Sequence, residues 1–312
     1  MSRRFLAALA VATSASLYAA APAFAAGGAP ARGAPIQDVI AGTLAATVAT
    51  AAVVWISMAH RSGRIRWLSR LAGFSERVSG LPGWAALPAA VTGGALVIAV
   101  FGYYWDVAKH IDTGRDPGPF GTAAHYPILI GLFGVALGGF LAVTLGCDGD
   151  EVPTSVRLAR GWHAPLGGLL IFLCGACALA GFPLDDVWHT LFGQDVTLWG
   201  PTHVLMVGGA SVSTLALWVL LVEGRRARPG PQPLTMRLRG PAIAGGFLIG
   251  LSALQAEFDY GVPQFQLVFQ PILIALAAGI GLTAARIKLG RWGALEAVAF
   301  YLVAALAHLD AD

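Results

Sequence analysis

Apolar residues fill most of the chain in long blocks, and short polar segments separate these blocks. Eight blocks approach or reach the roughly 20 residues that an α-helix needs to cross the hydrocarbon core of a bilayer. They lie at about 39–59, 84–105, 126–146, 164–184, 204–222, 241–258, 270–285 and 292–308. The pattern predicts an all-α fold, a polytopic membrane helical bundle of about 7–8 transmembrane helices. It leaves no room for a sizeable soluble domain.

The N-terminal segment differs from these blocks. Arg3 and Arg4 precede a short apolar run, which ends in the small-residue pattern Ala23-Phe24-Ala25. This order is typical of a secretory signal peptide. We therefore predict a cleaved signal peptide over residues 1–25 and a single polytopic transmembrane domain over 26–312. A retained signal anchor is the alternative.

Composition and charge agree with a membrane protein. Apolar residues make up 56% of the chain and charged residues 12%, and the mean hydropathy is +0.69. Every second polar segment is rich in Arg, which predicts that these segments face the cytoplasm and that the intervening ones face the periplasm or the exterior. Location in the inner (plasma) membrane follows. The net charge of +3 is accounted for by these basic segments, so it does not indicate a nucleic-acid partner.

The polar and apolar pattern also repeats, with a period of about 75 residues. Each copy has a basic segment, an outgoing helix, an acidic turn and a returning helix. We predict duplicated helical hairpins over about 84–146, 164–222 and 241–285. The turn of the third copy contains no His, and acidic or amide residues stand where the other copies have ligands: Glu257, Asp259, Gln264 and Gln266. Parallel repeats would bring equivalent turns together on one side of the membrane.

The first two turns carry nearly the same unusual set of residues. The spacing is Asp-x3-His-x14-His in the first turn and Asp-x3-His-x13-His in the second, with another Asp six residues after the first His of each. The predicted ligands are Asp106, His110 and His125, then Asp185, His189 and His203; the additional acids are Asp116 and Asp195.

The spacing indicates why these residues would meet. Side chains four residues apart share one face of a helix, so each Asp lies beside the first His of its set. The second His arrives at the start of the returning helix, where the helix dipole favours the neutral imidazole that a metal requires. Two imidazoles and a carboxylate suit copper, zinc or non-haem iron. Asp116 and Asp195 are expected to orient ligand rings rather than to bind the ion. A duplicated structural turn without metal is the alternative.

The second turn resembles a known copper motif. Asp185, Trp188, His189, Asp195, Pro201 and His203 match positions in a copper-binding membrane component of the particulate methane and ammonia monooxygenases, with Thr202 where that family has Ser and one extra residue before His203. The first turn matches more loosely. The resemblance covers about 20 residues per turn and implies copper as the metal. In that family this component has one such motif, and the enzymes are assemblies of three different subunits.

Three functions follow from these observations. The first is a copper-binding membrane protein resembling a monooxygenase subunit, which would require partner subunits and an electron donor for catalysis. The second is a copper-handling protein for storage, delivery or assembly, without turnover. The third is a structural or partner-binding membrane protein that holds no metal. The lipid bilayer is a partner in all three.

Overall fold

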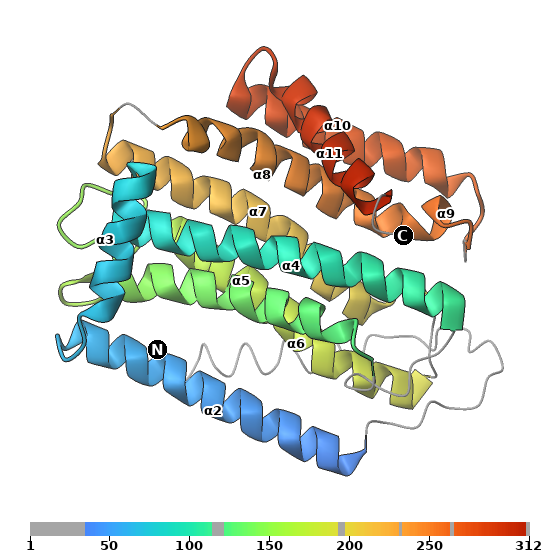
Figure 1. Cartoon of the computed structure of the whole chain (residues 1–312), viewed down its shortest axis with the longest axis horizontal. Helices are drawn as coiled ribbons and strands as arrows, with labels where there is room; N and C mark the ends of the chain where they lie inside the picture. Colours follow the sequence, from blue (N-terminus) through green and yellow to red (C-terminus); the bar gives the residue numbers. More distant parts are fainter. Residues whose placement is uncertain (1–34, 114–121, 193–196, 231–232, 263–264, 310–312) are drawn as a thin grey trace.

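The computed structural model describes residues 35–113, 122–192, 197–230, 233–262 and 265–309. Within these residues the fold is helical apart from one small hairpin (Figure 1). The elements are α2 (Ile36–Arg61), α3 (Trp67–Ser79), α4 (Gly83–Thr113), α5 (His125–Leu145), β1 (Val156–Ala159), β2 (Trp162–Ala164), α6 (Leu166–Phe192), α7 (Pro201–Ala227), α8 (Leu234–Ser252), η1 (Ala253–Gln255), α9 (Ala256–Asp259), α10 (Phe269–Leu289) and α11 (Gly293–Leu309).

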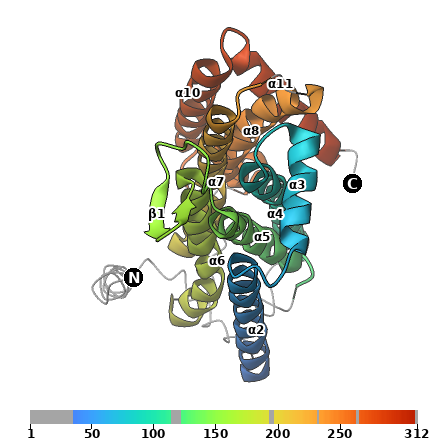
Figure 2. The ribbon, with the colours of Figure 1, turned by 90° about the vertical axis from the view of Figure 1, so that its left-hand side faces the viewer.

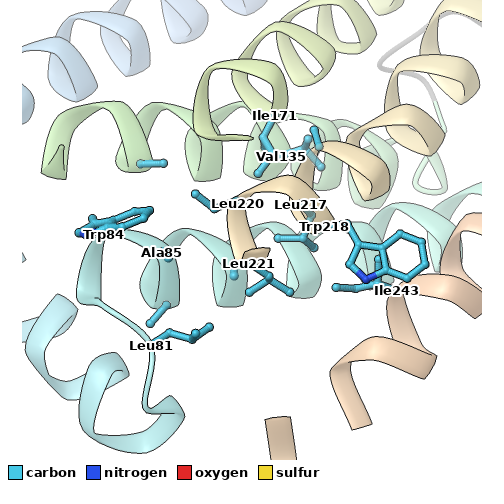
Figure 3. Packing of buried hydrophobic residues seen from close by; sticks show 14 of the residues in the cluster. Leu81, Trp84, Ala85, Val135, Ile171, Leu217, Trp218, Leu220, Leu221 and Ile243 are labelled. Atoms are coloured by element: carbon cyan, nitrogen blue, oxygen red, sulfur yellow. The ribbon is translucent and has the colours of Figure 1, made fainter. Parts of the chain in front are cut away.

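Helices α4, α5, α6 and α7 form the centre of the molecule. Each packs along its successor in the chain, and α4 also contacts α7, which closes a four-helix arrangement. Figure 3 shows the apolar side chains at the basic end of this core, including Trp84 from α4, Ile171 from α6 and Leu220 from α7. Small residues permit the close approach, because a Cβ on Gly139 of α5 would collide with the backbone of Phe172. Such contacts are typical of helices that pack inside a bilayer.

The remaining long helices surround this core. Helix α8 packs against α7, and α10 and α11 pack against α8 and against each other. Helix α2 lies on the opposite side, where it makes a smaller contact with α5. Its apolar residues are largely exposed, including Leu44, Val48 and Trp55. That exposure suits a helix that faces lipid.

One end of the bundle carries α3 and the β1–β2 hairpin. Figure 1 shows α3 lying across the ends of the long helices, and Figure 2 views this end directly. Strand β1 pairs with β2 antiparallel. Arg61 ties the end of α2 to this hairpin, because its guanidinium donates to Asp148 Oδ2 at 2.9 Å and to the Gly161 carbonyl at 2.8 Å. We call this end, which bears the Arg-rich segments, the basic end.

The prediction of an all-α polytopic membrane protein is confirmed. In the described residues, seven helices are long and apolar enough to span a membrane. The predicted eighth span corresponds to α11, whose apolar part, Gly293–Ala305, is shorter. The β1–β2 hairpin and the separate helix α3 were not predicted. The predicted signal peptide lies outside the described residues, and the origin of the helix pairs by duplication stays a prediction.

Candidate metal centres

The first triad lies where α4 ends and α5 begins, at the end of the bundle opposite to α3. Asp106 and His110 lie one turn apart on α4, and His125 is the first residue of α5. His125 Nε2 lies 3.1 Å from Asp106 Oδ1, and His110 Nδ1 lies 3.5 Å from the same oxygen. The two imidazole rings face each other with centroids 6.2 Å apart. One carboxylate oxygen therefore lies between two histidines.

The second triad has the same construction at the junction of α6 and α7. Asp185 and His189 lie one turn apart near the end of α6, and His203 lies in the first turn of α7, which Pro201 initiates. His189 Nε2 is 3.1 Å from Asp185 Oδ2, and His203 Nε2 is 3.3 Å from Asp185 Oδ1. Here each histidine approaches a different oxygen of the carboxylate.

In each triad, one ligand atom from every residue lies within 4.8 Å of the others, and all six residues are partly buried. Two imidazole nitrogens and a carboxylate oxygen at this spacing can converge on a single cation. Three protein ligands leave further coordination positions open on an ion such as Cu(II), Zn(II) or Fe(II).

The hydrogen bonds of His203 indicate that a cation belongs in the second triad. His203 Nδ1 lies 2.8 Å from the Thr197 carbonyl oxygen, and a carbonyl can only accept, so Nδ1 must carry a hydrogen. In the neutral ring Nε2 then has a lone pair, and this lone pair faces the carboxylate of Asp185 at 3.3 Å. Two acceptors repel unless a proton or a metal ion lies between them.

The first triad shows a related feature. His110 Nδ1 lies 2.9 Å from the backbone oxygen of Asp106 and so donates to it, which leaves Nε2 as the available donor atom for a metal. Asp106 Oδ1 is shielded from solvent and accepts no hydrogen bond of regular geometry from a described residue. A buried carboxylate oxygen is normally satisfied. A bound cation would satisfy it here, so the residues present fit a metal.

A chain of hydrogen bonds supports the second triad from outside. The Thr202 hydroxyl donates to Asp185 Oδ1 at 2.5 Å. The Thr197 hydroxyl and the Leu198 amide both donate to Glu257 Oε1, each at 2.6 Å. Glu257 belongs to α9 and is only 4% exposed. It therefore fixes the turn whose carbonyl, at Thr197, holds the ring of His203.

The two triads are neighbours. His125 of the first triad meets the ring of Phe182 edge to face, with centroids 5.7 Å apart. Phe182 is 7% exposed and lies on α6, one turn before Asp185 of the second triad. A single aromatic side chain thus separates the two groups. This agrees with the expectation that the His-bearing turns gather on one side, and it makes them two separate centres.

The six predicted ligands therefore come together as two groups of three. Asp116 and Asp195, predicted to orient the ligands, lie outside the described residues. Glu257, predicted to stand where a ligand might have been in the third hairpin, lies instead behind His203 as a hydrogen-bond acceptor. Thr197 and Phe182 were not predicted. Thr197 had no distinguishing sequence signal, and neither did Phe182, which resembles any other apolar residue of its span.

Comparison with known proteins adds no relative. No protein-family model matches the chain, and neither a curated protein nor a solved structure is found similar to it. The two triads and the seven apolar helices are thus the observations on which a function must rest.

Proposed function

We propose that this polytopic membrane protein binds copper at both triads, one ion in each. The observation that carries the proposal is the juxtaposition, in each triad, of two imidazole nitrogens and one carboxylate within 4.8 Å. Imidazole suits copper well, and Cu(II) binds N/O sites more tightly than other divalent first-row metals. The resemblance of the second turn to the motif of the particulate methane and ammonia monooxygenases supports copper over zinc or iron.

The charge pattern supports an orientation for these sites. Exposed arginines gather at the basic end, among them Arg64, Arg70 and Arg160, and positively charged loops stay in the cytoplasm. The triads lie at the other end of the bundle. They would then face the periplasm or the exterior of the inner (plasma) membrane, where copper arrives from outside the cell.

A second candidate, oxygen activation, is favoured by the open coordination positions and by the motif Asp185, Trp188, His189, Pro201 and His203. Bound copper would supply one-electron redox chemistry. The residues of the chain would hold the ion, keep the rings neutral and shield them from bulk solvent. Turnover would also need partner subunits and an electron donor. Storage or delivery of copper without turnover would use the same ligands.

Metal analysis of the purified protein tests the proposal. The native protein should retain copper near two equivalents after exposure to excess ion and washing. A variant with His110, His125, His189 and His203 all changed to Ala should lose it. The matched control changes His60 and His163, which lie at the basic end, to Ala and should retain both ions.

Each outcome has a defined meaning. Copper content that is equal in the native protein and the four-histidine variant would overturn the proposal and leave a duplicated structural turn. Zinc or iron in the native protein, lost in the same variant, would preserve the sites and reject copper. Oxygen consumption by the copper-loaded protein with a reductant would separate the oxygenase from a copper-handling protein.

A further inference from the structure

Helix α3 has an amphipathic surface that the metal centres do not use. It is a helix of 13 residues, about 20 Å long and too short to cross a bilayer. It connects α2 to α4 at the basic end and lies across the ends of the long helices (Figures 1 and 2). Because both neighbouring helices are candidate spans, α3 must lie at a membrane surface.

Four large apolar side chains of α3 are exposed along one stripe. Trp67 is 46% exposed, Leu71 47%, Phe74 58% and Val78 53%. At about 100° per residue, these four positions fall within roughly 60° of one another. An exposed stripe of this kind is expected where a helix meets acyl chains rather than water.

The opposite flanks of α3 are occupied differently. Leu68, Ala72 and Ser79 are buried against the bundle, on a face roughly 110° to one side of the stripe. Arg66, Arg70 and Arg77 are exposed on a face roughly 90° to its other side. With the stripe directed into the bilayer, the three guanidinium groups lie level with the lipid headgroups.

These three arginines are not neutralised within the protein. Among the described residues none of them forms an ion pair, and the single acid of α3, Glu76, is bound elsewhere. Its carboxylate pairs with Arg228 of α7 and accepts a hydrogen bond from the Gly83 amide at 3.0 Å. The outer face of α3 is therefore purely cationic.

We propose that α3 is an in-plane helix that binds anionic phospholipid headgroups at the basic end of the protein. The stripe inserts among the acyl chains, and Arg66, Arg70 and Arg77 bind the phosphates. Charge complementarity decides the occupant, since a neutral lipid surface would leave three cations unmatched. Each Arg close to an anionic surface contributes roughly fivefold to binding. This inference is independent of the metal centres.

Native mass spectrometry after exchange into detergent tests the proposal. The protein is first incubated with vesicles of phosphatidylcholine and phosphatidylglycerol in equal amounts. Phosphatidylglycerol should be retained selectively by the native protein, and a variant with Arg66, Arg70 and Arg77 changed to Gln should lose that preference by about tenfold or more. The matched control, Arg286, Lys288 and Arg291 changed to Gln, removes three charges at the same end and should retain it. Equal loss in both variants would overturn the proposal.

Depth measurements test the stripe itself. Spin labels at positions 74 and 70, each in a variant lacking the three native cysteines, are compared in vesicles of the same composition. The label at 74 should be more accessible to oxygen than to a polar nickel reagent, and the label at 70 should show the reverse. A label at 74 that is protected from both reagents would indicate a covering protein and would reject the lipid.

Discussion

Glu257 offers the sharpest test of how the second triad is held. Changing Glu257 to Ala removes the oxygen that accepts hydrogen bonds from the Thr197 hydroxyl and the Leu198 amide, both at 2.6 Å. The turn that carries the Thr197 carbonyl would relax, and His203 Nδ1 would lose its fixed acceptor at 2.8 Å. Removal of such outer contacts typically weakens metal binding by about 10- to 100-fold, which corresponds to roughly 1.4–2.7 kcal/mol. We expect that loss at the second triad only.

The assay is a competitive copper titration against a chelator of known affinity. It uses a background in which His110 and His125 are changed to Ala, so that only the second triad binds. Glu257→Gln is the conservative comparison, because its amide oxygen can still accept both hydrogen bonds. It should bind within a few-fold of the parent, since the bonds lose only the reinforcement by charge.

Glu223 provides a matched control for burial. It is also 4% exposed, and its carboxylate accepts hydrogen bonds from the Leu166 and Gly167 amides at 3.0 and 2.9 Å at the basic end. Glu223→Ala should therefore lower the thermal stability without altering the copper affinity of the second triad. If the Glu223 and Glu257 variants weakened copper binding equally, the effect of Glu257 would be general destabilisation and the reasoning would be refuted.

Three further predictions concern other parts of the molecule. Thr202→Ala removes the hydroxyl that donates to Asp185 Oδ1 and should weaken copper binding at the second triad about fivefold, or roughly 1 kcal/mol, in the same titration; an equal change at the first triad would contradict this. Gly139→Ala should lower the free energy of unfolding by roughly 1–3 kcal/mol through overpacking against the backbone of Phe172, whereas Gly208→Ala, with open space around it, should change the melting temperature little. For Asp148, burial raises the pKa, but hydrogen bonds from Arg61 and from the His163 amide and ring outweigh it, and the net pKa is lowered. A lowered pKa in the folded state means that Asp148 stabilises the protein above its unfolded pKa and that this contribution is lost as the pH falls through the folded one. Asp148→Asn should thus lower the melting temperature at pH 7 and lessen its decline between about pH 5 and pH 3; a decline as steep as in the parent would argue against the pairing.

The spans were predictable because a bilayer permits only apolar helices to cross it. The triads were predictable for a related reason. A spacing of four on a helix fixes Asp106 beside His110, and a short connection brings His125 back to the same end. The contact of Glu257 with Thr197 was not predictable, because it joins residues that lie 60 positions apart in the sequence. Its position depends on how α8 and α9 pack beside α7.

Helix α3 shows a different limit of the same reasoning. Its arginines identify a cytoplasmic segment, but they do not reveal that the segment is a helix with three distinct faces. The alternation of Leu68 and Ala72 with Leu71 and Phe74 indicates burial on one side and exposure on the other only when the neighbouring helix is in place. Likewise, residues 156–164 form a hairpin because Arg61, Trp162 and Asp148 interact there, and those residues are distant in the sequence.

The position of Phe182 between the triads has a consequence for how the two sites would fill. A ring spacing of 5.7 Å from His125, followed by one helical turn to Asp185, places two bound ions roughly 10 Å apart. A divalent ion in a site with one carboxylate leaves a net charge of about +1, and two such charges repel by roughly 1.7 kcal/mol at an effective dielectric constant near 20. The first ion would then weaken the second by about tenfold or somewhat more. The protein would carry one ion when metal is scarce and two when it is abundant, so its loading would report the supply over a wider concentration range than a single site can.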